Sequence, residues 1–71
     1  MGKPLSEIKI TPYRLQILQY VADGKRNHEI AEVMNVRATA VQQQIYIAMT
    51  EFGKSSRSGL VAHLIRKNIL K

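Results

Sequence analysis

Three consecutive glutamines, Gln42, Gln43 and Gln44, lie in a stretch of the 71-residue chain that carries no acidic residue from Val33 to Thr50. A glutamine amide donates and accepts a hydrogen bond at the same time, and this pair of groups matches the N6/N7 edge of adenine. Without carboxylates, the stretch can approach a phosphate backbone without charge repulsion. These residue types therefore suit contact with nucleic acid, although glutamines in a row can equally cover a solvated helix face.

The balance of charge favours a polyanionic partner. Eleven Lys and Arg residues against five Asp and Glu residues give the chain a net charge of +6. Such a field attracts nucleic acid or an acidic membrane or protein surface. Lys25 and Arg26 directly precede a predicted helix, where the helix dipole disfavours positive charge. A phosphate partner is one explanation for these two cations, and solubility is the other.

The same search for chemistry argues against an enzyme. His28-Glu29 begins like the helix of a zinc protease, but Glu32 stands where the second histidine ligand would be, and His63 belongs to a different predicted helix. The chain has no phosphate-binding glycine loop, no serine paired with a plausible base and no cysteine. We therefore expect no catalytic activity, no metal site and no cofactor.

Two helices joined by a tight turn are predicted between residues 27 and 52. Asn27 stands at the expected N-cap of the first helix, whose apolar residues recur at helical spacing. Asn35 tolerates the left-handed conformation that ends a helix abruptly, and Val36 can enter the core after it. The second helix, about residues 37–52, has one apolar face, which predicts a helix-turn-helix. The apolar positions are Ile30, Ala31 and Met34, followed by Val41, Ile45, Ala48 and Phe52.

One further helix on each side completes a predicted all-α bundle of four helices over residues 10–71. Thr11-Pro12 supplies a hydroxyl cap and a proline at the first helical position, and Asp23-Gly24 ends this helix. The fourth helix is predicted from Arg57 or Ser58 to Asn68. The apolar positions are Ile17, Leu18 and Val21 in the first helix and Leu60, Val61, Leu64 and Ile65 in the fourth, with Ile69 and Leu70 folding back onto the core.

Residues 1–9 lack a clear period, so we expect a flexible N-terminal arm. Its Lys3 and Lys9 can touch phosphates or simply belong to a solvated tail. No apolar run is long enough to span a bilayer, and the N-terminus lacks the apolar segment of a signal peptide. The sequence therefore predicts a cytoplasmic chain with no membrane partner.

A family resemblance extends over nearly the whole chain, from about Ile10 to Leu70. The residues that carry it are Thr11-Pro12, Ile17-Leu18, Val21-Ala22-Asp23-Gly24, Asn27-His-Glu-Ile-Ala-Glu32, Val36, Val41, Phe52-Gly53, Ser56-Arg57 and Leu60-Val61. On these residues the chain resembles the DNA-binding domain of the LuxR/GerE family of bacterial transcription regulators. The resemblance implies that the third helix enters the major groove of double-stranded DNA and that members pair through the fourth helix as dimers. Because no further domain is attached, we expect a free-standing regulator of bacterial or phage origin.

The resemblance also places the DNA contacts. It puts base-reading side chains on the outer face of the third helix, and Arg37 at the end of that helix where a phosphate or a guanine is favoured. The implied base contacts are Gln42, Gln43, Tyr46 and Arg37. The implied phosphate contacts are Lys25, Arg26, Asn27, Thr39, Lys54 and Arg57.

The chain departs from the family pattern at several positions. Tyr13-Arg14 stands where the family usually has a glutamate, and Arg37 stands where it has a serine cap. Gln42 and Gln44 replace a lysine and a histidine, and Ile47 replaces an asparagine, so the groove-facing surface is less basic than usual. We expect Gln44 to pack or cap internally. Ile47 can pack beside the fourth helix, meet a thymine methyl or contact a protein partner.

Dimerisation would use the outward positions of the last helix, for which the candidates are Val61, His63, Leu64 and Lys67. The same residues can equally be ordinary surface and core positions. A rival hypothesis is a helix-turn-helix that acts as a protein-interaction module. In that case Tyr46, Ile47 and the glutamines would bind and modulate another regulator or RNA polymerase.

Overall fold

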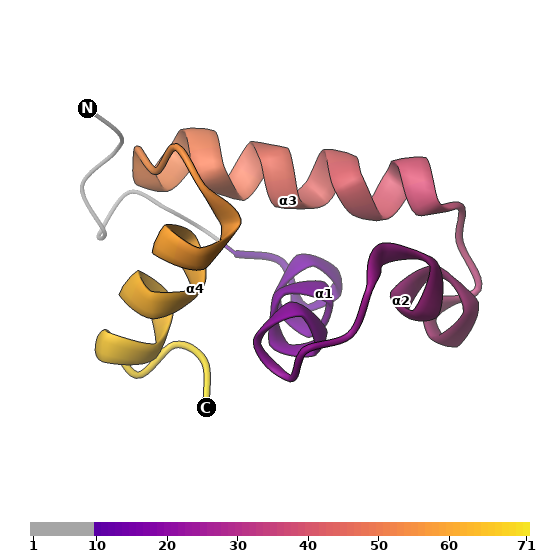
Figure 1. Ribbon diagram of the computed structural model, residues 1–71, viewed down its shortest axis with the longest axis horizontal. Helices are drawn as coiled ribbons and strands as arrows, with labels where there is room; N and C mark the ends of the chain where they lie inside the picture. The colour runs from indigo at the N-terminus through magenta and orange to yellow at the C-terminus, as the bar shows by residue number, and fades with distance from the viewer. Residues whose placement is uncertain (1–9) are drawn as a thin grey trace.

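The computed structural model describes residues 10–71, which form four helices and no strand. The predicted arm at residues 1–9, with Lys3 and Lys9, lies outside the described residues. The longest helix, α3 (Ala38–Phe52), packs against the other three, and α1 (Pro12–Ala22) lies between α2 (Asn27–Met34) and α4 (Arg57–Arg66) (Figure 1). The predicted all-α bundle of four helices is confirmed.

The first helix begins and ends as its sequence predicts. The Thr11 hydroxyl accepts a hydrogen bond from the backbone N–H of Arg14 at 3.2 Å, and Pro12 occupies the first helical position, where no N–H is needed. Gly24 ends α1 with a φ of +89°, in the left-handed region that favours glycine. The Thr11 cap thus defines the start of α1, and Gly24 marks where the chain turns toward α2.

The start of α2 corrects one prediction, because the capping residue is Arg26 and Asn27 is already the first helical residue. The Glu29 side chain accepts a hydrogen bond from the Arg26 backbone N–H at 2.8 Å, and this bond lowers the pKa of Glu29. An arginine side chain has no acceptor, so Glu29 alone provides the side-chain half of this cap. The Asn27 amide is thereby free for a tertiary contact.

The turn between α2 and α3 follows the prediction. Asn35 adopts φ 56° and ψ 46°, and the Val36 backbone N–H donates to the Ala31 carbonyl at 2.9 Å. Arg37 then precedes α3 without a side-chain cap, and Gly53 ends α3 with a φ of 67°. In the helix-turn-helix, α2 therefore ends at Asn35 and the fifteen-residue α3 ends at Gly53, and both of these residues have left-handed backbone conformations.

The last helix is two residues shorter than predicted, since α4 ends at Arg66 and not at Asn68. Its N-cap is Ser56, whose hydroxyl accepts from the Gly59 backbone N–H at 3.0 Å. Asn68 has a φ of 60°, and the Ile69 backbone N–H donates to the Leu64 carbonyl at 2.9 Å. This reversal directs the last residues back onto the core, as predicted.

The core lies where all four helices meet, and α4 buries only part of its predicted apolar face. Leu60 and Leu64 are fully buried, whereas Ile65, another apolar position of the predicted helix, is 42% exposed. Each fully buried Leu or Ile stabilises the fold by about 1.5–3 kcal/mol. The buried residues are Ile17, Leu18, Ile30, Ala31, Val41, Ile45, Ala48, Phe52, Leu60, Leu64 and Leu70.

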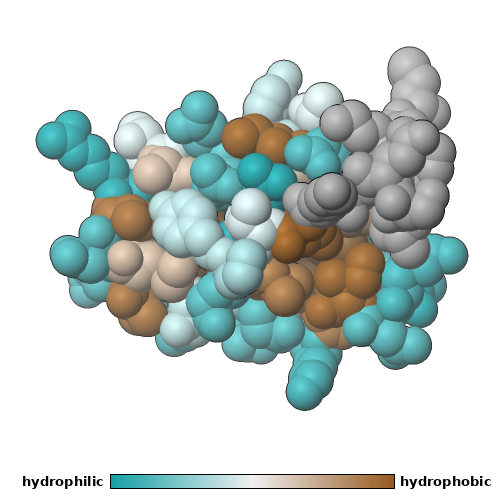
Figure 2. All heavy atoms as spheres, turned by 180° about the vertical axis from the view of Figure 1, so that it is seen from behind, coloured by the Kyte–Doolittle hydropathy of each residue, from teal (hydrophilic) through white to brown (hydrophobic). Residues whose placement is uncertain are grey.

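Hydrophilic side chains cover much of the face shown in Figure 2, and the hydrophobic ones gather in several separate groups. Within residues 10–71, no helix is long and apolar enough to cross a bilayer.

Candidate nucleic-acid interface

The outer face of α3 carries the side chains that were predicted to read bases. Val41 and Ile45 point into the core, so helical geometry turns Gln42, Gln43 and Tyr46 outward, and all three are exposed. Tyr46 is 68% exposed, so its phenol ring is accessible from solvent. Rigid α3 therefore presents two amides and one phenol on a single accessible surface.

Gln44 differs from its two neighbours because it contacts α1. Its Oε1 accepts a hydrogen bond from Arg14 Nε at 2.9 Å, as the prediction of an internal role requires. The Arg14 guanidinium also pairs with Glu51 at 3.5 Å, and the two side chains are 15% and 21% exposed. Two positions that depart from the family pattern, Arg14 and Gln44, thus meet in the fold. Glu51, the acidic residue of α3, is neutralised by the same arginine.

A groove runs between the outer side of α3 and the start of α4, with a volume of about 470 Å³. We call it the α3–α4 groove. It is the place where predicted base contacts and predicted phosphate contacts come together, two of each kind. Its lining consists of Asn27, Gln42, Ile45, Tyr46, Met49, Ser55, Ser56 and Arg57.

Arg57 is fixed at the edge of this groove by a residue 30 positions away. Its Nη1 donates to Asn27 Oδ1 at 2.8 Å, which joins the start of α4 to the start of α2. The hydrogen bond uses only part of the guanidinium, which carries five N–H donors. The Asn27 side chain therefore holds Arg57 in place, and a direct phosphate contact by Asn27 stays a prediction.

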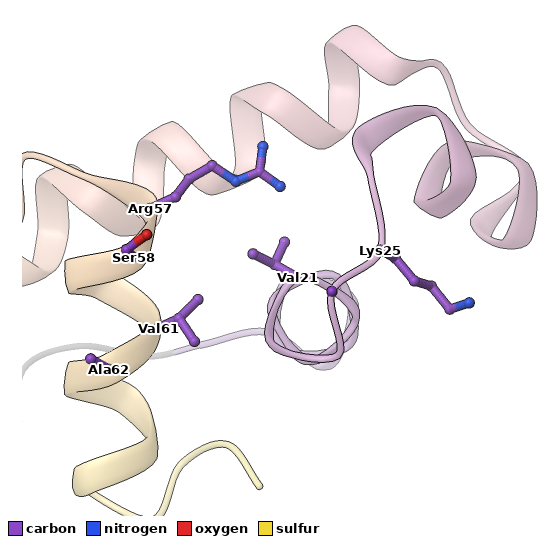
Figure 3. A pocket seen from close by; sticks show the side chains of 7 residues that line it. Val21, Lys25, Arg57, Ser58, Val61 and Ala62 are labelled. Atoms are coloured by element: carbon purple, nitrogen blue, oxygen red, sulfur yellow. The ribbon is translucent and has the colours of Figure 1, made fainter.

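A second groove, of about 480 Å³, separates the end of α1 from α4. Figure 3 shows Val21 facing α4 near Val61, while the Lys25 side chain points away from α4. The Lys25 ammonium lies 5.8 Å from the centre of the Tyr20 ring, in cation–π contact. Lys25 and Arg57 both line this second groove, so Arg57 stands between the two concavities.

The other predicted DNA contacts lie at the ends of helices and not in the α3–α4 groove. Arg26 and Arg37 are exposed and precede α2 and α3, where open backbone N–H groups also favour an anion. Thr39 is exposed in the first turn of α3, and Lys54 is half-buried in the connection to α4. Gln43 is exposed but does not line the groove.

Sequence reasoning missed Met49, Ser55 and Ser56 as groove residues. Met49 is half-buried and packs against the core, so its helical position alone indicates packing. Ser55 and Ser56 belong to the connection that folds back over α3. Residue spacing along the chain does not indicate that a connection folds back against the preceding helix. This contact is therefore visible only in the tertiary structure.

The predicted dimer residues on α4 are not equally accessible. Leu64 is completely buried in the core, so its assignment to a dimer interface is wrong. His63 is half-buried with its ring 5.7 Å from the Phe52 ring, and burial, with nearby Lys54, lowers its pKa. Val61 is half-buried and Lys67 is exposed.

Ile47 is half-buried and does not belong to the core cluster of residues 10–71 or to the residues packed on it. In the same described part of the chain, no group of three or more His, Asp or Glu residues is placed to hold a metal ion.

The comparison with known families agrees with this arrangement. A family model described as "Bacterial regulatory proteins, luxR family" matches residues 9–64, which include α1, α2, α3 and most of α4. No curated protein matches the chain. The match covers the helix-turn-helix and the whole α3–α4 groove, and it supports a DNA-binding regulatory domain. The chain therefore belongs to the LuxR family of bacterial regulatory proteins.

Proposed function

We propose that this protein is a sequence-specific DNA-binding transcription regulator of bacterial or phage origin, with α3 in the major groove. The observation that carries the proposal is the α3–α4 groove, which joins Gln42 and Tyr46 to Asn27 and Arg57. An amide and a phenol that can meet base edges thus lie beside a cation that can hold the adjacent phosphate. The net charge of +6 supports the same partner.

In this proposal the exposed amides of Gln42 and Gln43 read adenine, because each can pair with N6 and N7 together. Tyr46 contacts a neighbouring base or sugar from the groove. Arg37, at the N-terminal end of α3, binds a phosphate or a guanine. Gln44 takes no part in base reading, since its carbonyl oxygen is occupied by Arg14.

Phosphate contacts give the affinity and position the protein on the duplex without reading sequence. Along the chain, Lys25 and Arg26 precede α2, and Lys54 and Arg57 follow α3. The residues proposed for this role are Lys25, Arg26, Asn27, Thr39, Lys54 and Arg57.

We propose that two copies bind together through α4, so that their recognition helices reach half-sites about one helical turn apart. Val61, His63 and Lys67 are the candidates that keep some accessible surface. Leu64 instead supports this helix from inside the core.

The rival function is a protein-interaction module that modulates another regulator or RNA polymerase. The observation in its favour is the exposure of Tyr46 and the half-exposed Ile47, since such side chains are common at protein interfaces. A pull-down with Tyr46→Ala and Ile47→Ala tests it. If the protein is an interaction module, both variants no longer bind the partner in the pull-down. The DNA assays then select no specific duplex, even with the unaltered chain.

The deciding experiment enriches duplexes from a randomised pool on the purified chain and measures affinity by fluorescence anisotropy at several salt concentrations. We expect the enriched duplex to bind about a hundredfold more tightly than the pool. Gln42→Ala should weaken binding only to the enriched duplex, and Arg26→Ala should weaken binding to every duplex. If no duplex is enriched and binding disappears near physiological salt, sequence-specific DNA binding by this chain alone is refuted.

A further inference from the structure

Three side chains connect α1 to the recognition helix on the flank away from the α3–α4 groove. Arg14 Nε donates to Gln44 Oε1 at 2.9 Å, and Arg14 Nη1 lies 3.5 Å from Glu51 Oε1. The Arg14 backbone is itself held by the Thr11 cap at 3.2 Å. We call Arg14, Gln44 and Glu51 the α1–α3 clamp.

The clamp contacts α3 at two points on the same flank. Gln44 and Glu51 are seven residues apart, which is about two helical turns and about 10.5 Å along the axis. A single guanidinium therefore contacts α3 at two heights, and both contacts oppose sliding of the helix and rotation about its own axis. Arg14 and Glu51 are mostly shielded from water, so their attraction is stronger than that of a fully exposed ion pair.

From this geometry we infer that Arg14 is a positioning residue that sets the rotation of α3 and thereby the fidelity with which Gln42 and Gln43 read bases. The inference rests on the proposed function, because it assumes that α3 reads DNA. Gln44 directly follows the two reading residues, so a change in its position is transmitted through one or two peptide units.

The size of the effect follows from the width of a helix. Side-chain tips lie about 5–6 Å from the helix axis, so a rotation of about 10° moves them by about 1 Å. Hydrogen bonds keep their strength only over about 0.5 Å in length, so such a rotation breaks a bidentate glutamine contact. One such contact gives about 5-fold to 150-fold discrimination between bases. Phosphate contacts from flexible lysines and arginines tolerate the same shift.

The charge-swapped pair provides the test. Arg14→Glu and Glu51→Arg each place like charges together, whereas the double variant Arg14→Glu/Glu51→Arg restores an opposite pair with the original net charge. The Gln44 amide can serve either partner, because it carries both an acceptor and donors. Arg66→Glu and Glu32→Arg, at exposed positions, are the matched charge controls.

The readout is the ratio of affinities for the enriched duplex and the random pool, measured on variants whose circular dichroism shows them folded. We expect each single variant to lose at least about tenfold in this ratio, and the double variant and both controls to stay within about threefold of the unaltered chain. In NMR spectra of the DNA-free protein, the backbone amide resonances of residues 42 to 46 should shift in each single variant. In the double variant they should return to their positions in the unaltered chain.

Folded single variants that keep the full ratio overturn the inference, and so does a double variant that folds but loses as much as the singles. If one single variant does not fold, the other single variant decides together with the double variant, by the same criteria. An unaltered chain that enriches no duplex refutes the proposed function. The amide resonances then still report whether the clamp positions α3.

Discussion

Replacing Arg57 with alanine is predicted to weaken binding to all duplexes and to make the binding affinity less dependent on salt concentration. Arg57 lies between the two grooves and keeps free N–H donors beyond its bond to Asn27. A protein that neutralises Z phosphates shows a log–log salt slope of about −0.9Z. The candidate cations of one chain are Lys25, Arg26, Arg37, Lys54 and Arg57.

If all five bind phosphates, the slope for each bound chain is about −4.5, and affinity falls about 500-fold between 50 and 200 mM salt. With four contacts the slope is about −3.6 and the fall is about 150-fold. The difference of about 0.9 in slope is measurable by anisotropy titrations at four or five salt concentrations. Arg57→Lys keeps the charge and should keep the slope, although it loses the planar fork that reaches Asn27.

Arg66→Ala is the matched control, because Arg66 is exposed at the far end of α4 from the α3–α4 groove. It should leave the slope unchanged. The reasoning about Arg57 is refuted if Arg57→Ala and Arg66→Ala give the same slope as the unaltered chain while both remain folded by circular dichroism.

Three further predictions concern stability. Leu64→Ala, in the core, should lower the free energy of unfolding by about 2–5 kcal/mol in urea titrations, and a loss below about 1 kcal/mol would place Leu64 at an accessible surface after all. Gly24→Ala meets no neighbouring atom but must adopt a φ of +89°, so it should cost about 1–2 kcal/mol, whereas a neutral result would mean that the turn can relax. The pKa of His63 is lowered in the folded chain, mainly by burial and then by Lys54, so the unfolded chain takes up the proton more readily. The thermal midpoint should therefore be highest above the unfolded pKa of about 6.5 and fall as pH drops through the folded pKa, and His63→Gln should remove that part of the pH dependence.

Local signals predicted most of the helix boundaries, because each depends on one or two residues. Thr11, Gly24 and Asn35 cap or stop their helices through their own side chain or backbone freedom. The buried face of α4 was harder to predict, since Leu60 with Leu64 and Val61 with Ile65 are both spaced four residues apart. Only the position of the other helices decides that the leucines face the core and that Ile65 is exposed.

The contacts that define the candidate site join residues far apart in the chain. Arg14 meets Gln44 and Glu51 across 30 and 37 residues, and Arg57 meets Asn27 across 30. Residue types and periodicity gave the outward face of α3 but carry no information on which long side chain reaches which partner. The sequence therefore predicted Gln42 and Gln43, the proposed base-reading residues, as part of the exposed surface of α3, and did not predict the contacts between α1 and α3.

The error in the predicted N-cap of α2 lies at Asn27, a residue that lines the α3–α4 groove. Asn27 is a strong capping residue, so a reading of local preference assigns its amide to the helix start. In the fold, Glu29 accepts from the Arg26 backbone N–H, and the Asn27 oxygen is used to hold Arg57 at 2.8 Å. A cap made by Glu29 thus releases a polar side chain that orients a cation at the edge of the α3–α4 groove. The capping preference of Asn27 is therefore overridden by its hydrogen bond to Arg57, the residue of α4 that is proposed to contact DNA.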